Sequence, residues 1–164
     1  MVSENALLAF AQRTNALRFI IPSLAGGVLF MTGVFAFLRE DSPTSWSMTP
    51  LTWVAALLMV QAVLAALFLG PRAQKSNAQV ILRAGGRDPL NLAPSYVTGG
   101  IVGAALLEGV ALLAALAFFM DGSLIALLIA IALALLIPVL FYPTTSRVRH
   151  WYEDCEEMIR RQSR

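Results

Sequence analysis

Four long stretches almost without acidic or basic side chains constrain this chain more than any other feature. They cover residues 19–38, 51–69, 96–119 and 124–142, and together they contain one such side chain, Glu108. An α-helix needs roughly 20 apolar residues to cross a hydrocarbon core of about 30 Å, and each stretch has that length. The chain is 58% hydrophobic and 13% charged, whereas soluble domains are about 45–50% apolar and about 25% charged. The pattern therefore predicts four transmembrane helices.

Neither buried helices of a soluble protein nor a cleaved signal peptide fits these stretches as well. Helices buried inside a soluble protein would need amphipathic partner segments, and the chain offers none that could cover four such helices. A cleaved signal peptide would end in small residues. The first stretch instead follows eighteen residues and ends in Phe37-Leu38-Arg39-Glu40. We therefore expect an all-α, polytopic membrane protein with four retained spans.

The Lys and Arg residues predict how these spans are oriented. Eleven of the twelve fall in the N-terminal segment, in the loop after the second span or in the C-terminal tail, and Arg39 is the exception. Basic loops are retained preferentially in the cytoplasm. We therefore expect both termini and the 71–95 loop to be cytoplasmic, in a multi-pass protein of the cell (inner) membrane. Anionic lipid headgroups would then be partners of the basic clusters, and the formal charge of +2 requires no nucleic acid.

This topology divides the chain into three parts: a cytoplasmic amphipathic segment (1–18), a four-helix transmembrane domain (19–142) and a cytoplasmic amphipathic tail (143–164). We expect residues 3–17 to form a short helix along the membrane surface, with Ser3 as its N-cap. Gly70-Pro71 predicts an end or a kink of the second span, followed by a cytoplasmic helix over 72–84. Asp121-Gly122 predicts a tight turn that makes the third and fourth spans an antiparallel hairpin.

The tail repeats apolar side chains at helical spacing opposite a strongly charged face. These side chains are Val148, Trp151, Tyr152, Cys155, Met158 and Ile159. A helix of this kind can lie in the membrane interface or bind a partner helix. Trp151 and Tyr152, together with Tyr96, fall near the inner boundary, where amphipathic rings prefer to lie.

Small residues on the spans indicate faces where helices approach closely, as in small-xxx-small motifs. The residues that we expect to mediate helix packing are Gly26, Gly27, Gly33, Ala62, Ala66, Gly99, Gly100, Gly103 and Ala104. Such faces predict contacts with other membrane subunits or with copies of this chain.

Glu108 lies close to the middle of the third span, the depth at which a carboxylate is most costly. A charge at mid-membrane costs about 2.5–3.5 kcal/mol on insertion scales. We therefore expect the carboxyl to be protonated unless water or a cation reaches it. Gln61 lies near mid-depth in the second span and could donate a hydrogen bond to it. Two hypotheses follow: a protonated Glu108 that joins helices through Gln61, or an ion-binding Glu108 that carries a proton during transport.

Residues 86–112 show a resemblance to a known family. Gly86-Arg87-Asp88-Pro89 followed by Gly103-Ala104-Ala105-Leu106-Leu107-Glu108-Gly109-Val110-Ala111-Leu112 is similar to the proteolipid c-subunits of rotary ATP synthases. In that family a cytoplasmic Arg-x-Pro loop precedes a helix with the ion-binding carboxylate, so the resemblance implies that Glu108 carries protons. The whole chain also resembles small four-helix membrane proteins of bacteria, a resemblance that implies no function.

We expect no enzymatic activity, because the sequence offers no nucleophile paired with a base. It also has no metal-ligand or phosphate-loop pattern, so we expect no metal and no cofactor. His150 and Cys155 are two isolated candidate ligands without a third. The leading hypothesis is a non-enzymatic structural or accessory component of a membrane assembly, with a homo-oligomer as one form of that assembly. The alternative is a proton-translocating, c-subunit-like protein that uses Glu108.

Overall fold

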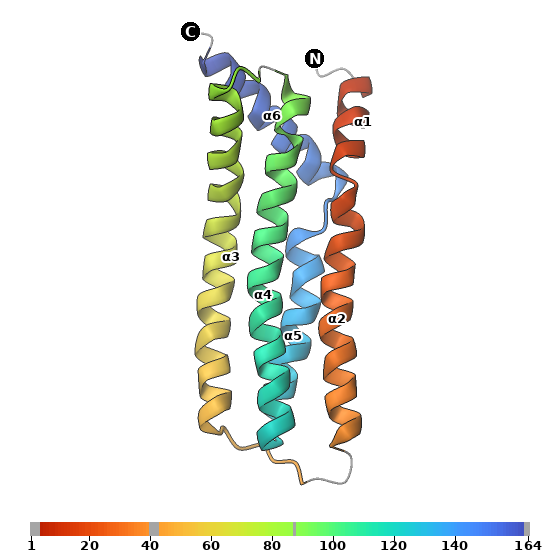
Figure 1. Ribbon diagram of the computed structural model, residues 1–164, viewed down its shortest axis with the longest axis vertical. Helices are drawn as coiled ribbons and strands as arrows, with labels where there is room; N and C mark the ends of the chain where they lie inside the picture. The colour runs from red at the N-terminus through yellow and green to blue at the C-terminus, as the bar shows by residue number, and fades with distance from the viewer. Residues whose placement is uncertain (1–3, 40–42, 87, 163–164) are drawn as a thin grey trace.

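The computed structural model describes residues 4–39, 43–86 and 88–162, and these are almost entirely helical (Figure 1). In chain order the elements are α1 (Glu4–Arg13), α2 (Ala16–Leu38), α3 (Pro50–Arg83), the 3₁₀ helix η1 (Pro89–Leu92), α4 (Ala93–Asp121), α5 (Leu124–Phe141) and α6 (Thr145–Gln162). Within the described ranges β-structure is limited to one isolated bridge between Ser45 and Ser123.

Among the described residues, four helical segments are long and apolar enough to cross a membrane, as the sequence predicts. They are Leu8–Leu38, Pro50–Arg83, Pro89–Asp121 and Leu124–Phe141. This composition fits a multi-pass membrane protein. The all-α fold class is confirmed at this level.

The four helices form a bundle around α4, which packs against α2, α3 and α5 (Figure 1). Alanine makes this close packing possible, because its small side chain lets helix axes approach. Ala104, Ala111, Ala114 and Ala115 on α4 are fully buried, as are Ala130 and Ala134 on α5. α2 also packs against α5, whereas α3 packs mainly on α4. α2 and α3 therefore flank the bundle on opposite sides.

α1 differs from its prediction. It ends at Arg13, and α2 begins at Ala16 after a turn at Thr14-Asn15. Figure 1 shows α1 stacked above α2, nearly along the bundle axis. The reason is that Phe10 and Thr14 are buried, with the Phe10 ring edge-on to Tyr152 of α6 at 5.5 Å between centroids. The proposed N-cap, Ser3, lies outside the described residues.

α3 corrects one of the two predictions for Gly70-Pro71: the second span does not end there, because α3 runs as one helix from Pro50 to Arg83. At about 1.5 Å per residue a helix of 34 residues is about 51 Å long, well beyond a hydrocarbon core. Proline removes one hydrogen bond, but packing on both sides of Pro71 holds the helix together. Gly70 is buried before the proline, and Ala78 and Leu82 are buried after it.

α6 forms the predicted amphipathic helix but uses its apolar face within the chain. Figure 1 shows α6 crossing the end of the bundle at which α1 lies, hereafter the α1/α6 end. Val148, Trp151, Tyr152 and Cys155 are all buried there. The Trp151, Tyr152 and Tyr96 rings pack inside the chain at this end, and each residue is over 90% buried.

The predicted hairpin turn closes the opposite end, hereafter the Gly122 end. Gly122 has a positive φ of 70° and separates α4 from α5. A Cβ at this position would lie 2.7 Å from the Pro43 carbonyl oxygen and would overlap the Arg39 guanidinium. The segment after α2 is joined to the turn by hydrogen bonds from Ser45 N to Gly122 O (3.0 Å) and from Leu124 N to Ser45 O (2.9 Å).

Arg39 is held at the Gly122 end by carbonyl groups. Its guanidinium donates hydrogen bonds to the Phe119 and Met120 carbonyls in the last turn of α4, and to Pro43 O at 3.1 Å. Helix C-termini leave carbonyls without intrahelical donors and carry partial negative charge. The one basic residue outside the basic clusters is therefore the C-terminal cap of α4.

Candidate functional site

Glu108 lies at the edge of the buried face of α4. Its neighbour Leu107 is fully buried, Gly109 is exposed, and Glu108 itself is half-buried. Gly70 of α3 lies beside Gly99 of α4, since a Cβ added at Gly70 would lie 3.6 Å from the Gly99 carbonyl oxygen. Because the two helices are antiparallel, this register places Gln61 and Glu108 at about the same depth.

The predicted bond between Glu108 and Gln61 is not formed. Gln61 is on the exposed side of α3, and no hydrogen bond joins the two side chains within the described part of the chain. Sequence spacing found the shared depth of the two residues correctly. It could not tell that Gln61 turns outward, because that depends on which face of α3 packs against α4.

The predicted packing residues separate into two groups. Ala62 and Ala66 of α3 are buried, and Gly99, Gly100, Gly103 and Ala104 of α4 are buried as well. The α4 glycines make room for neighbouring side chains: a Cβ at Gly99 would overlap Gln74, and a Cβ at Gly103 would overlap the Phe141 ring. Gly26, Gly27 and Gly33 of α2 are exposed, and nothing lies within 4 Å of a Cβ added at any of them.

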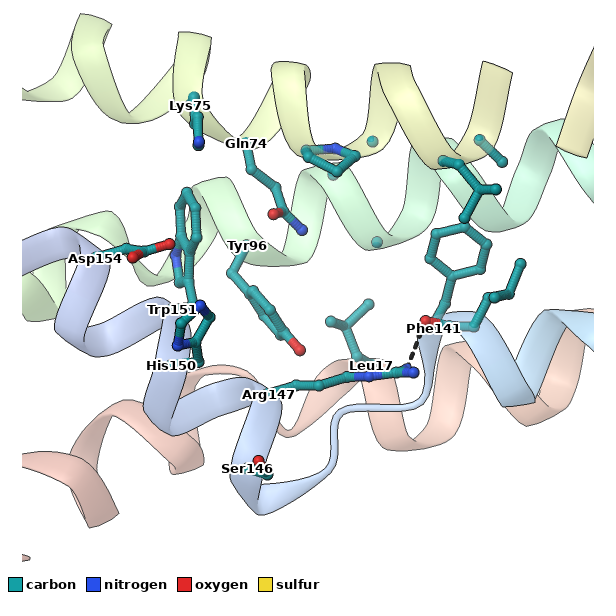
Figure 2. A pocket seen from close by; sticks show the side chains of 17 residues that line it. Leu17, Gln74, Lys75, Tyr96, Phe141, Ser146, Arg147, His150, Trp151 and Asp154 are labelled. Carbon is teal, nitrogen blue, oxygen red and sulfur yellow. Dashed lines mark hydrogen bonds between the residues drawn. The ribbon is translucent and has the colours of Figure 1, made fainter. Parts of the chain in front are cut away.

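A cavity of about 570 Å³ opens at the α1/α6 end, where the glycines of α4 leave space beside α3 (Figure 2). Its size falls in the range of about 300–1,000 Å³ typical of ligand pockets. Figure 2 shows Gln74, Tyr96 and Arg147 reaching toward this space from α3, α4 and α6. Its lining also includes Lys75 of α3 and His150, Trp151 and Asp154 of α6.

Arg147 anchors the wall formed by α5 and α6. Its guanidinium donates hydrogen bonds to Leu140 O (2.5 Å), Val139 O (3.1 Å) and Tyr142 O (3.4 Å), carbonyls at or just past the end of α5. The buried Pro143 follows these residues and cannot donate a backbone hydrogen bond to them. Arg147 therefore caps α5 as Arg39 caps α4, but it does so while lining a cavity.

Trp151 lines the cavity and carries an unpaired donor. The residue is 6% exposed, and its indole Nε1, which is closed off from solvent, has no hydrogen-bond partner among the described residues. Its ring lies 6.3 Å from that of Tyr96. An unpaired buried N–H costs about 1–3 kcal/mol, so a group of this kind is uncommon unless a ligand or water pairs with it.

Sequence reasoning missed this cavity because its residues come from five helices. Signals did exist at either side of it: Gly99-xxx-Gly103 on one helix, and a tail that combines Arg147, His150 and Trp151. The folding of α6 back over the bundle brings the two together, and the tail pattern alone does not specify it. Among the described residues no cluster of three or more His, Cys, Asp or Glu side chains could hold a metal ion.

Comparison with known proteins adds no family: no family model, no curated protein and no solved structure matches the chain. The resemblance of residues 86–112 to the c-subunits of rotary ATP synthases therefore has no support from a family match.

Proposed function

We propose that this chain is a non-enzymatic structural or accessory component of a membrane assembly, with both termini on the cytoplasmic side of the cell (inner) membrane. The orientation is supported by the eleven basic residues of the two termini and the 71–95 loop. The assembly role is supported by one outward-facing surface of α2, which the fold leaves without a partner inside the chain.

This surface, the α2 seam, consists of residues that recur every three or four positions along the helix. They are Phe19, Ser23, Gly26, Phe30, Gly33 and Phe37, and all six are exposed. The three phenylalanines are 72%, 71% and 74% exposed. A spacing of alternating three and four residues is that of helices that pack knobs into holes. The seam combines three large side chains with three small ones, so one surface offers both knobs and holes.

Contact with lipid alone does not explain why the seam contains glycine. Glycine in a helix interior costs about 1 kcal/mol relative to alanine, and a lipid-facing helix gains nothing from it. Gly33 lies in a hollow of about 370 Å³ lined by Phe30, Val34 and Phe37 among others. Such a hollow lets a neighbouring backbone approach, which is how transmembrane helices associate. The partner is another membrane subunit or a second copy of this chain.

The test fills the seam without disturbing the bundle. Gly26→Leu adds a side chain where nothing lies within 4 Å, so the variant is expected to fold and to lose the larger assembly in mild detergent. Gly27→Leu is the matched control, because Gly27 is equally open but lies off the seam. Size-exclusion chromatography with light scattering measures the assembly. A monomeric wild type that purifies without other subunits would overturn the proposal.

A second candidate function, proton translocation through Glu108, is favoured by one observation. Glu108 is half-buried and forms no side-chain hydrogen bond with a described residue, so no protein partner holds its carboxyl group in one protonation state. Glu108→Gln keeps the shape of the side chain and removes the titratable group. A proton carrier would assemble normally and lose proton flux in reconstituted vesicles. Unchanged flux in that variant, or no carbodiimide labelling of Glu108 in the wild type, would exclude this function.

A further inference from the structure

We propose that the cavity at the α1/α6 end binds the phosphate group of an anionic phospholipid from the adjoining leaflet. This inference depends on the four helices spanning a membrane, but not on the α2 seam. The cavity lies between α3 and α6, with α4 beneath it (Figure 2).

The lining of the cavity is amphipathic in the way that a phospholipid requires. It includes the apolar residues Leu17, Ala66, Leu67, Leu140 and Phe141. It also includes hydrogen-bonding and charged groups, chiefly Lys75, Tyr96, Arg147 and His150. A soluble phosphate compound would use the polar groups alone, whereas a phospholipid would contact both kinds of residue.

The charges of the cavity favour an anion. Lys75 and Arg147 are two cations, and Asp154 is the one carboxylate among the lining residues. Arg147 already contacts carbonyls of α5, but a guanidinium has five N–H donors and can serve an additional acceptor. These three residues have a net charge of about +1, so a phosphodiester with a single negative charge would bring the net charge of the site close to zero.

Trp151 is part of the cavity lining, so its indole ring can report on what enters the cavity. Its Nε1–H has no partner among the described residues, but it is closed off from solvent and from the open space of the cavity. Arg39 Nε at the other end of the bundle is buried and unpaired in the same way. The cavity and its charged lining, rather than these donors, therefore point to a ligand.

The depth of the cavity matches that of lipid headgroups. It lies beside Gly70 and Pro71 on α3 and beside Phe141 at the end of α5. At both places the apolar stretch ends and polar sequence begins. Polar headgroups lie just outside the hydrocarbon core. A lipid phosphate is therefore the anion most available to this site.

The experiment uses Trp151 as the reporter. Trp46→Phe and Trp53→Phe remove the other two tryptophans, which are 68% and 55% exposed and lie outside the cavity. The full chain in nonionic detergent is titrated with phosphatidylglycerol, with phosphatidylcholine of the same acyl chains, and with inorganic phosphate. We expect a saturable change in Trp151 emission with phosphatidylglycerol, about tenfold weaker binding of phosphatidylcholine, and no binding of inorganic phosphate at the same concentrations.

Matched variants locate the effect within the cavity. Lys75→Gln is expected to weaken phosphatidylglycerol binding by about five- to tenfold. Arg72→Gln makes the same charge change one turn earlier on α3, at an exposed residue outside the cavity lining, and should change nothing.

Three results would overturn the proposal. Equal binding of phosphatidylcholine would mean that the site does not recognise headgroup charge. Saturation by inorganic phosphate would make it a site for soluble anions. Equal losses in Lys75→Gln and Arg72→Gln would reduce the effect to general attraction between a basic surface and an anionic lipid.

Discussion

At both ends of the bundle the carbonyl groups of a helix C-terminus need hydrogen-bond donors, and the surroundings of these carbonyls differ between the two ends. At each end an arginine donates hydrogen bonds to carbonyls around a helix C-terminus, Arg39 for α4 and Arg147 for α5. At the Gly122 end the connecting segment closes over this cap, joined to the turn through Ser45 and by Ser123 Oγ donating to Ser47 O at 2.9 Å. At the α1/α6 end the cap forms one wall of a cavity of about 570 Å³.

The Gly122 end is closed by its own polar groups, whereas the α1/α6 end has polar groups beside an open cavity. The Gly122 end uses its polar groups to close the chain, so function is not needed to account for them. The α1/α6 end places two cations, Lys75 and Arg147, around an open cavity. Each end has one buried unpaired N–H, Arg39 Nε and Trp151 Nε1, so the asymmetry lies in the cavity and its charged lining, which points to the α1/α6 end as the place for a ligand.

The largest expected effect tests how tightly the Gly122 end is closed. Gly122→Ala forces an L-residue into left-handed backbone, which costs roughly 1–2 kcal/mol, and displaces Arg39 as well. Thermal unfolding in detergent, followed by circular dichroism, should show a clear fall in Tm. Gly109→Ala is the control: that glycine is helical, and nothing lies within 4 Å of an added Cβ, so its Tm should be unchanged or higher. Equal Tm values for the two variants would contradict the closed turn.

The second prediction compares the two arginine caps directly. Arg39→Gln should lower the unfolding free energy by about 1–2 kcal/mol, in the range for hydrogen bonds from a charged donor. Arg147→Gln should cost less, about 0.5–1 kcal/mol, because Arg147 is exposed and solvent competes for its bonds. Denaturant titrations of both variants measure the difference. The reverse order would show that the α1/α6 end depends more on its cap than its exposure indicates.

A smaller effect is expected for the unpaired donor. Trp151→Phe removes an N–H that has no partner, and the lost ring area offsets the relief of its desolvation. We expect the unfolding free energy without added lipid to stay within about 1 kcal/mol of the wild-type value. A much larger loss would mean that Nε1 already has a partner, such as an ordered water, and would weaken the comparison between the two ends.

The smallest effect concerns how firmly α6 stays on the bundle. Burial raises the pKa of the Cys155 thiol to about 12, with a smaller contribution from the negative charge of Asp154. The thiol is protonated in the folded chain, so its stabilising contribution is complete below the unfolded pKa of about 8.5. That contribution is lost as the pH rises toward 12. Maleimide should label Cys155 slowly at pH 8 and rapidly once the chain is unfolded in SDS. Rapid labelling of the folded chain would mean that α6 opens.

How far the sequence predicted the molecule depends on the range of the interactions involved. The helical segments and the Asp121-Gly122 turn were found because apolar length and a left-handed glycine are local properties. The end of the second span at Gly70-Pro71, one of two alternatives, was predicted wrongly, because burial of Ala78 and Leu82 keeps α3 continuous beyond the proline. Likewise, Gln61 lies at about the depth of Glu108, but on the exposed side of α3 rather than on the side that packs against α4.

By itself the sequence determined that four helices are long and apolar enough to cross a bilayer, and that basic residues gather in three of the segments outside them. Both follow from the transfer of side chains out of water, which each segment undergoes independently of its neighbours. Tertiary structure alone decided that Arg39 is a helix cap, that the tail helix covers its own bundle and that a cavity lies beneath it. These depend on which faces meet, and helices of alanine, leucine and glycine have many near-equivalent faces until packing selects one.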